Sequence, residues 1–553
     1  MADMNEPLKP INTSFYDFEK LVTGGFVYVD KTAQIYELAK PTADGLYYLP
    51  RPRRFGKSLM ISTLKALFQG RRELFKDLAI ERTDWDWEKE VYPVLHLDMS
   101  VVASKTADEL EISLQDLIEG LGATFNAPFN PAKPAKTNFK NLLEALPRVA
   151  KQMDEKTAGK YVLLIDEYDA PIAGLLDSDE GRAELPRVRK ALHDFYVQAK
   201  AHCGDMRFLM VTGVSKFAKT SIFSAFNNPR DLTLDARAAD VVGYTHEEME
   251  TYFHGHIQAF ADANGLAYDA AFAELLRWYD GYQFSPRKFV KVVNPVSLGT
   301  ALTACEFGNY WEATAGSTLI FDALKAKNAA PIDFAKRFKT MTLDAPDALT
   351  APTVSLLYQG GYLTIDGRVN GETVALRIPN EEVRSSLYRG YLAQLLGNDF
   401  ELDDFSLTAE ETAAELFADE TGAKFAELLK AAFAKIPHEW LDRSEKEIKR
   451  YFLAYMVFAR AEVVSEEQHS LGRPDSVVKT EKAIYIVEFK YGQSAEAALR
   501  QCREKRYADA YADDPRRVVY VGVNYDPAAR TIGEVKTEAA ILQVNKKMAQ
   551  PDD

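Results

Sequence analysis

The stretch RPRRFGKS, residues 51–58, holds residue types that together bind phosphate. Gly56 permits a close approach of the backbone, Lys57 supplies a full positive charge, and the hydroxyl of Ser58 can ligate Mg²⁺. The usual phosphate-binding loop has another glycine where this chain has Arg51. That glycine shapes the loop without contacting phosphate, so Arg51 makes the motif less specific but leaves its chemistry intact.

Two strand-like runs end in groups that a bound ATP and its Mg²⁺ require. YVLLID (161–166) ends in Asp166, which can hold the Mg²⁺ shell, and the adjacent Glu167 can polarise the attacking water. RFLMVTG (207–213) contains Thr212, which can sense the γ-phosphate. Acidic residues also end strands in many α/β proteins. Together with the apolar run that precedes the RPRRFGKS loop, however, these make three strand ends in the right order, which favours a nucleotide site.

The loop contributes three more predicted nucleotide contacts, which are Arg53, Arg54 and Phe55. The two arginines lie near the phosphates in sequence and act either within the chain or across a subunit interface. The sequence therefore leaves the oligomeric state open, and an oligomer is compatible with it.

A second chemical cluster lies in LGRPDSVVKTEKAIYIVEFKYG, residues 471–492. If residues 481–482 form a two-residue hairpin turn, Asp475 lies opposite Glu488 on the neighbouring strand. Side chains two apart along a strand share a face, so Lys490 projects beside Glu488. The sequence thus predicts two carboxylates and a lysine at one point of a sheet.

Such a cluster can cut a phosphodiester. Asp475 and Glu488, with the carbonyl of Phe489, offer the hard oxygen ligands that Mg²⁺ or Mn²⁺ prefers. A metal ion there would activate a water molecule and neutralise charge on the phosphodiester, while Lys490 orients or helps to deprotonate that water. The alternative is a cross-strand salt-bridge cluster on a solvated sheet face.

The pattern along the chain indicates what positions these groups. The first ~240 residues alternate apolar runs with helical patterns, which is typical of a mostly parallel sheet covered by helices. From about Tyr244 the chain becomes helical and aromatic, and residues 355–383 read as a short helix, a strand, a turn at Asn370–Gly371 and a second strand, as in a winged helix. Acidic, alanine-rich helices are expected from about Leu407 to Lys435, and strand-and-helix alternation then resumes.

We therefore predict an α/β protein with four parts. Residues 1–240 form a P-loop ATPase-like domain with a parallel sheet, and residues 241–405 form a helical and winged-helix-like lid. Residues 406–440 form a helical linker, and residues 441–553 form a separate α/β domain, whose Asp475, Glu488 and Lys490 resemble the core of the restriction-endonuclease-like fold.

Composition limits the function classes. The 553 residues carry a net charge of −15, which argues against nonspecific coating of nucleic acid but leaves room for a local basic groove. No apolar run approaches the ~18 residues that a membrane span needs, and the first residues lack the features of a signal peptide. Three cysteines far apart in sequence form no CxxC pair, so we expect a cytoplasmic protein with reduced thiols and no membrane partner.

Two segments have open alternatives. FNNPRDLT (226–233) is either a loop that faces the nucleotide or another domain, or an ordered turn whose Asx residues cap their own backbone. The aromatic cluster in WYDGYQF (278–284) is expected to be core rather than a platform for stacking bases.

Several long motifs together resemble one family. RPRRFGKS and LLIDEYDAP resemble the bacterial AAA-ATPase-like proteins, as do FVYVDKT (26–32), TGVSKFAKTSIFSAFNNPRDLT (212–233), WYDGYQF, NPVSL (294–298) and YQGGYLTI (358–365). Members of this family carry a P-loop ATPase in front of a PD-(D/E)XK nuclease-like domain. The resemblance runs from about Phe15 almost to the C-terminus and includes the arginine at the first glycine position. It implies the nucleotide-binding roles given above for Lys57, Ser58, Asp166 and Glu167.

The resemblance also extends the C-terminal site. The spacing from Pro-Asp to Glu-x-Lys resembles the PD-(D/E)XK core, whose sites are often completed by an upstream acid. Glu462, Glu466 and Glu467 are the candidates for this acid, and Glu467 is preferred. The helical pattern AALRQCREKRYADAY resembles the helix behind such a site, which would carry Gln501 and Lys505 toward the substrate.

These observations predict an ATPase and nuclease in which nucleotide state gates a metal-dependent phosphodiesterase, with DNA a better candidate substrate than RNA. Defence against invading DNA and repair both fit this interpretation. The alternative is an ATPase switch whose C-terminal domain binds nucleic acid or a partner without cleaving it. A protein-remodelling ATPase would need a substrate-threading ring, which no feature of the sequence indicates.

Overall fold

The computed structural model describes residues 7–214, 229–311, 321, 337–343, 345, 351–368, 372–396, 420–434, 448–449, 452–453, 456, 462–465, 474–480, 482–529 and 531–540. The chain divides into two compact units. The first comprises Met1–Ala323 and Lys336–Ser386, and the second comprises Leu324–Ala335 and Leu387–Asp553. Among the described residues, no helix is both long and apolar enough to cross a membrane.

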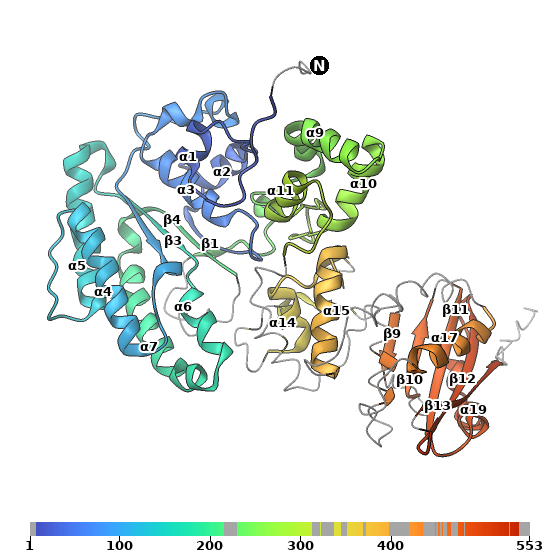
Figure 1. Ribbon diagram of the computed structural model, residues 1–553. Coiled ribbons are helices and arrows are strands. Elements are labelled where there is room, and N and C mark those ends of the chain that lie inside the picture. Colours follow the sequence, from blue (N-terminus) through green and yellow to red (C-terminus); the bar gives the residue numbers. More distant parts are fainter. Residues whose placement is uncertain are drawn as a thin grey trace, which may run out of the picture. The chain divides into compact units, whose positions relative to one another are not determined.

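The first unit is built on a five-stranded parallel sheet with the strand order β2-β3-β4-β1-β5 (Figure 1). The strands are β1 (Leu46–Pro50), β2 (Val94–Asp98), β3 (Tyr161–Asp166), β4 (Met206–Gly213) and β5 (Arg230–Asp231). All six residues of β3 are buried, as expected for a strand covered on both faces. The predicted parallel sheet is therefore confirmed.

Helices cover both faces of this sheet (Figure 1). Leu163 and Leu209 point to one face, where they share a core with α4 (Ala107–Thr124), α5 (Ala135–Met153) and α7 (Asp179–Ala201). Phe208 points to the other face and contacts Phe68 at the end of α3 (Lys57–Phe68). The shorter helices of this region are α1 (Phe18–Thr23), α2 (Thr32–Ala39) and α6 (Ala170–Ala173).

A helical region follows the sheet in the same unit. Its helices are α9 (His246–Ala263), α10 (Tyr268–Tyr279) and α11 (Pro295–Ala304), and Thr245 and Glu248 form a capping box that starts α9. Tyr279, Tyr282 and Phe284 are buried, and Trp278 is partly buried against the core of this region. The prediction that the cluster is core is therefore confirmed for the first three residues, with Trp278 at the edge of the core.

The remaining elements of the first unit form a small three-stranded sheet with the order β6-β8-β7. They are β6 (Phe338–Lys339), α13 (Thr340–Leu343), α14 (Thr353–Gln359), β7 (Thr364–Arg368), β8 (Thr373–Arg377) and α15 (Glu381–Leu396), whose last residues belong to the second unit. The predicted succession of a short helix and two antiparallel strands is confirmed by α14, β7 and β8. The predicted turn at Asn370–Gly371 lies outside the described residues.

The second unit contains a mixed sheet with the order β13-β12-β11-β10-β9. Its strands are β9 (Glu462–Ser465), β10 (Ser476–Lys479), β11 (Ala483–Tyr491), β12 (Arg517–Asp526) and β13 (Thr531–Ala539). Strands β11 and β12 run parallel, and the other neighbours are antiparallel.

The helix α19 (Ala495–Glu504) connects β11 to β12 and packs on the face that carries Ile484 and Ile486. The other face carries Tyr485 and is covered by α17 (Ala423–Ala434) and by Ile448. The segment whose composition predicts a linker thus contributes α17 to this core.

Candidate nucleotide and nuclease-like sites

The phosphate-binding loop predicted from the sequence connects β1 to the first residue of α3. Gly56 precedes α3 with a left-handed φ of 90°, and a Cβ at this residue would have no atom within 4 Å. A side chain in place of Gly56 would therefore be strained in its backbone and would occupy open space beside the start of the helix. That space, next to the N-terminal amides of a helix, is where an anion binds best.

Lys57 is folded back over the loop. Its side chain is buried, and its ammonium group donates to the carbonyl oxygens of Arg51 and Pro52, each at 3.0 Å. Burial lowers the pKa of Lys57, whereas the nearby carboxylates of Glu167 and Asp166 oppose this effect. The lysine therefore lies between the loop carbonyls and the acidic end of β3.

Arg51 takes a structural role in place of the missing glycine. Its guanidinium is buried and donates to the carbonyls of Pro50 (2.9 Å), Thr233 (3.0 Å) and Ala238 (2.8 Å), with a longer bond of 3.4 Å to Leu232. It also lies over the ring of Phe284, 4.3 Å from the centroid. The sequence motif gave no indication of this buried clamp, because its acceptors are backbone atoms about 180 residues further along the chain.

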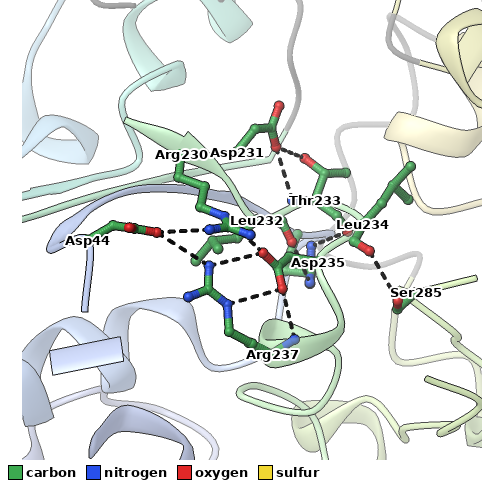
Figure 2. A network of polar contacts seen from close by, with 10 residues as sticks. Asp44, Arg230, Asp231, Leu232, Thr233, Leu234, Asp235, Arg237 and Ser285 are labelled. Carbon is green, nitrogen blue, oxygen red and sulfur yellow. Dashed lines mark hydrogen bonds and ion pairs between the residues drawn. The ribbon is translucent and has the colours of Figure 1, made fainter. Parts of the chain in front are cut away.

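The segment that accepts these bonds is itself ordered by ion pairs. Figure 2 shows Arg230 and Arg237 converging on Asp44 and Asp235, with N–O distances from 2.9 to 3.7 Å. Asp231 accepts from the backbone N–H and the hydroxyl of Thr233 in an Asx turn.

Of the two alternatives for FNNPRDLT, the self-capped turn is therefore observed from Arg230 onward. Asn227 and Asn228 of this segment lie outside the described residues.

The acidic end of β3 lies next to β4. Thr212 donates its hydroxyl proton to Asp166 Oδ1, which also accepts from the backbone N–H of Glu167 at 3.1 Å. Glu167 has a left-handed φ of 50°, a conformation that is strained for a non-glycine residue and occurs often at functional sites. Burial raises the pKa of Glu167, and the charge of Lys57 opposes that rise. The structure thus brings Asp166, Glu167 and Thr212 together, with Lys57 close enough to influence the glutamate.

The other predicted loop contacts differ in exposure. Arg53 is exposed, whereas Arg54 has a left-handed φ of 69° and donates to the hydroxyl of Tyr16 at 2.8 Å. Ser58 is half-buried in the first turn of α3. The side chain of Phe55 is buried edge-to-face against Tyr282 and Phe284, so its ring helps to hold the loop.

A pocket of about 70 Å³ opens beside Gly56. Its walls are mainly apolar and come from the N-terminal segment, the start of α3, residues 241–244 and the start of α11. Phe15, Val29 and Pro295 line it, together with the polar residues Asn12 and Lys31.

In the second unit, the predicted hairpin register is confirmed. Ser476 pairs with Val487, which sets Asp475 opposite Glu488 as expected. Asp475 Oδ1 lies 2.6 Å from the ammonium of Lys449, and Oδ2 accepts from the backbone N–H of Phe489 at 2.8 Å.

Glu488 is buried and belongs to the same polar cluster. Its Oε1 atom accepts from Lys490 at 3.0 Å and from the side-chain amide of Gln501. Its Oε2 atom is buried and has no hydrogen-bond partner among the residues that the structure describes. Burial raises the pKa of Glu488 to about 7, and the negative charge of Asp475 adds to the rise. Lys490 also donates to the carbonyl of Phe489 at 3.1 Å.

A glycine allows α19 to approach this site. Gly522 pairs with Glu488 on the neighbouring strand, and a Cβ there would lie 2.2 Å from the carbonyl oxygen of Ala495. The close approach lets α19 place Gln501 against Glu488, whereas Lys505 is exposed at the C-terminal end of the helix. That both residues face a substrate stays a prediction. Sequence reasoning missed Gly522 and Lys449, since neither belongs to a local motif.

The upstream acid stays a prediction. Glu462 pairs with Lys479, at the end of β10 away from Asp475, while Glu466 and the preferred Glu467 lie outside the described residues. Within the part of the chain that the structure describes, no group of three or more His, Cys, Asp or Glu side chains could hold a metal ion. Asp475 and Glu488 nevertheless fit a divalent cation, because they present hard oxygen ligands and one of these is buried with no donor from the described residues.

Comparison with known proteins agrees with both units. Residues 12–223 match the family model for a predicted AAA-ATPase, and residues 443–535 match the model of the PD-(D/E)XK nuclease superfamily. The chain belongs to the family of predicted AAA-ATPases that carry a C-terminal domain of this nuclease superfamily.

One relative covers nearly the whole chain. It is an uncharacterized protein in the vnfD 5′ region of Azotobacter chroococcum mcd 1, 30% identical over 541 residues. The match spans 95% of this chain and 98% of the relative. The resemblance identified from the sequence motifs is therefore confirmed.

Proposed function

We propose that the chain binds and hydrolyses ATP and that its C-terminal unit is a metal-dependent phosphodiesterase acting on nucleic acid. The observation that carries the second half is the pairing of Asp475 with Glu488 on neighbouring strands. Among the residues that the structure describes, one oxygen of Glu488 is buried without a donor, a costly arrangement that a cation would relieve. A bound Mg²⁺ or Mn²⁺ would supply an activated water and neutralise charge on the phosphodiester.

The residues of the C-terminal site have distinct proposed roles. Asp475, Glu488 and the carbonyl of Phe489 would hold the metal ion, and Glu467 would complete its ligands. Lys490 would orient or deprotonate the attacking water, and its contact with both Glu488 and Phe489 supports that position.

For ATP, we propose that the phosphates lie at the start of α3. Lys57 now bonds two loop carbonyls, which are weaker partners than the oxygens of a triphosphate, so it can turn to the β- and γ-phosphates. Ser58 and Asp166 would hold Mg²⁺, and Glu167 would polarise the attacking water. Thr212 would act on the site through its hydrogen bond to Asp166.

The binding of the adenine ring and the roles of two arginines complete the proposed ATP site. The apolar pocket beside Gly56 suits an adenine ring, with Phe55 forming part of its wall. Arg53 and Arg54 would contact the phosphates, either within one chain or between copies in an oligomer.

A cleavage assay tests the nuclease proposal. The full chain is incubated with matched DNA and RNA strands in Mg²⁺, in Mn²⁺ and in EDTA, and we expect metal-dependent cleavage, with DNA preferred. Asp475→Ala and Lys490→Ala should abolish cleavage while leaving ATP hydrolysis without nucleic acid near wild type, because their chemistry is local. Cleavage that persists in both variants would contradict the assignment.

We further propose that nucleotide state gates cleavage. Glu167→Gln should bind ATP and Mg²⁺ but hydrolyse slowly, since the amide cannot polarise water as the carboxylate does. Cleavage in this variant should be locked high or low, and removing ATP should reverse it. Equal cleavage with and without ATP, at the wild-type rate, would mean that the two sites are uncoupled.

A second function is favoured by one observation. Lys449 and Lys490 already pair with Asp475 and Glu488, as they would in a site that binds nucleic acid or a partner without cutting it. Binding of nucleic acid without cleavage in any metal ion would support that alternative.

The domain division and the cellular setting are also proposals. We assign residues 1–240 to the ATPase core, 241–405 to the lid, 406–440 to a helical connection and 441–553 to the nuclease-like domain. A cytoplasmic role in defence or repair fits the combination of activities.

A further inference from the structure

Lys449 contacts the nuclease-like carboxylates from outside the hairpin that carries them. Its ammonium lies 2.6 Å from Asp475 Oδ1, and the two side chains are 21% and 15% exposed. The adjacent Ile448 and the nearby Phe452 are buried in the core of the second unit, where Phe452 contacts Phe489 edge-to-face. Packing therefore anchors the backbone that carries Lys449, so the contact differs from a loose ion pair at the surface.

The hydrogen bonds at the site leave few oxygens for a metal ion. Asp475 Oδ2 accepts from the backbone N–H of Phe489, which the strand holds in place. Glu488 Oε1 accepts from Lys490 and Gln501, and in the described part of the chain no donor reaches the buried Oε2 atom. A divalent cation that takes one oxygen from each carboxylate would use Glu488 Oε2 and the Asp475 oxygen that Lys449 contacts.

We propose that Lys449 is a tethered counter-ion of Asp475. A divalent cation displaces the lysine from this carboxylate, and the displaced lysine then binds the phosphodiester of the substrate. This inference rests on the proposed metal-dependent function. An ammonium and a divalent cation at one partly buried oxygen repel each other strongly, so only one of them occupies it. The displaced lysine stays beside the carboxylates, where the substrate brings a phosphate, a strong partner for an ammonium.

The exchange couples the two ligands of the site. Metal binding releases Lys449 for the phosphate, and a bound phosphate draws Lys449 away from Asp475. By linkage, each ligand must strengthen the binding of the other by the same factor. Lys449 would then favour loading of the site with metal when nucleic acid is present.

Mn²⁺ titration of the full chain tests the competition. Lys449→Met removes the charge and keeps most of the stem, and it should bind Mn²⁺ about five- to tenfold more tightly than wild type, as expected for the loss of one partly buried ion pair. Lys449→Arg keeps the charge and should stay near wild type. Lys424→Met is the matched control, because Lys424 lies on α17 of the same unit and pairs with Glu427 at 3.4 Å. This control should change Mn²⁺ affinity less than twofold.

Duplex binding tests the second half of the proposal. In Ca²⁺, which keeps a charged ligand at the site and is expected not to support cleavage, the affinity for a short duplex is measured at several salt concentrations. Lys449→Met should weaken binding and reduce the slope of log affinity against log salt by about one, the change expected for one lost phosphate contact. Lys424→Met should leave the slope unchanged.

The outcomes separate this inference from the proposed function. If wild type binds Mn²⁺ and Lys449→Met binds it equally or more weakly, with both folded by circular dichroism, the competition is refuted while the metal site stands. If neither protein binds Mn²⁺, the metal-dependent function and this inference both fail. Tighter Mn²⁺ binding with an unchanged salt slope would refute the phosphate contact alone.

Discussion

Replacing Arg51 by glycine would restore the usual phosphate-loop sequence, yet we expect it to damage the protein. Arg51 is not among the left-handed residues of the loop, which are Arg54 and Gly56, so the backbone at position 51 has no need of a glycine. The guanidinium makes three hydrogen bonds of 2.8 to 3.0 Å with buried carbonyls and stacks on Phe284. A glycine there would gain no loop geometry and would lose all of these contacts.

The cost follows from these contacts. A buried carbonyl left without its donor costs about 1–3 kcal/mol, and the added freedom of glycine in the unfolded chain costs a further ~0.5–1 kcal/mol. Burial of the guanidinium is itself unfavourable, as its pKa, lowered to about 10, indicates, so part of the loss is recovered when it is removed. We expect Arg51→Gly to destabilise the first unit by about 3–5 kcal/mol, and Arg51→Lys by a smaller amount, because one ammonium cannot reach all of these acceptors.

The measurement combines denaturant unfolding, followed by tryptophan fluorescence, with titration of ATP and Mg²⁺. All five tryptophans of the chain, Trp85, Trp87, Trp278, Trp311 and Trp440, must be assigned to their unfolding transitions by single replacement. Arg51→Gly should unfold at lower denaturant and bind ATP no better than wild type. A variant as stable as wild type, or one that binds ATP more tightly, would show that Arg51 is only a tolerated departure from the motif.

Three further predictions concern the two sites. Lys57→Ala should reduce ATP affinity about tenfold or more, since it removes the main charge facing the phosphates, whereas Lys65→Ala on the same helix should bind normally in the same titration. In EDTA, Glu488→Gln should be more stable than wild type by about 1–3 kcal/mol at pH 8 and should lose that advantage by pH 5 in urea unfolding. The sign follows because the folded state raises the pKa of Glu488 to about 7, so wild-type stability falls as pH rises from about 4.5 to about 7. Equal stability curves at pH 5 and 8 would contradict this. Gly522→Ala should push α19 away from Ala495 and lower both stability, by about 1–3 kcal/mol, and cleavage. Gly533→Ala, where the nearest atom lies at 3.3 Å, is its control.

Local patterns predicted the elements that a local signal defines. The run Tyr161–Asp166 reads as a buried strand because every residue but the last is apolar, and the strand has these same bounds. The register of β10 and β11 follows from the short turn and the alternation of side chains alone. The sequence alone therefore predicts that Asp475 and Glu488 lie opposite each other.

Contacts between distant parts of the chain could not be predicted in this way. Lys449 reaches Asp475 through the packing of Ile448 and Phe452 on the opposite sheet face, and no spacing in the sequence encodes that geometry. Gly522 is required only because α19 passes over β12 at that residue. Likewise, Arg51 departs from a motif, and only the folded chain reveals the carbonyls that it binds.

The two candidate sites hold their lysines in different ways, and this difference bears on how each is loaded. Lys57 is held by the dipoles of two backbone carbonyls. Because a triphosphate carries full negative charge, ATP can bind the ammonium of Lys57 without displacing a carboxylate. Lys449 is held by the full charge of Asp475, so its release needs a second cation to take its place. At the first site, ATP can therefore take the lysine contact directly, whereas at the second site a metal ion must first replace Lys449 at Asp475 before the lysine can contact a phosphate. Because each ligand strengthens the binding of the other, such a site would be loaded most fully when metal and nucleic acid are both present, which suits the proposed control of cleavage by nucleotide state.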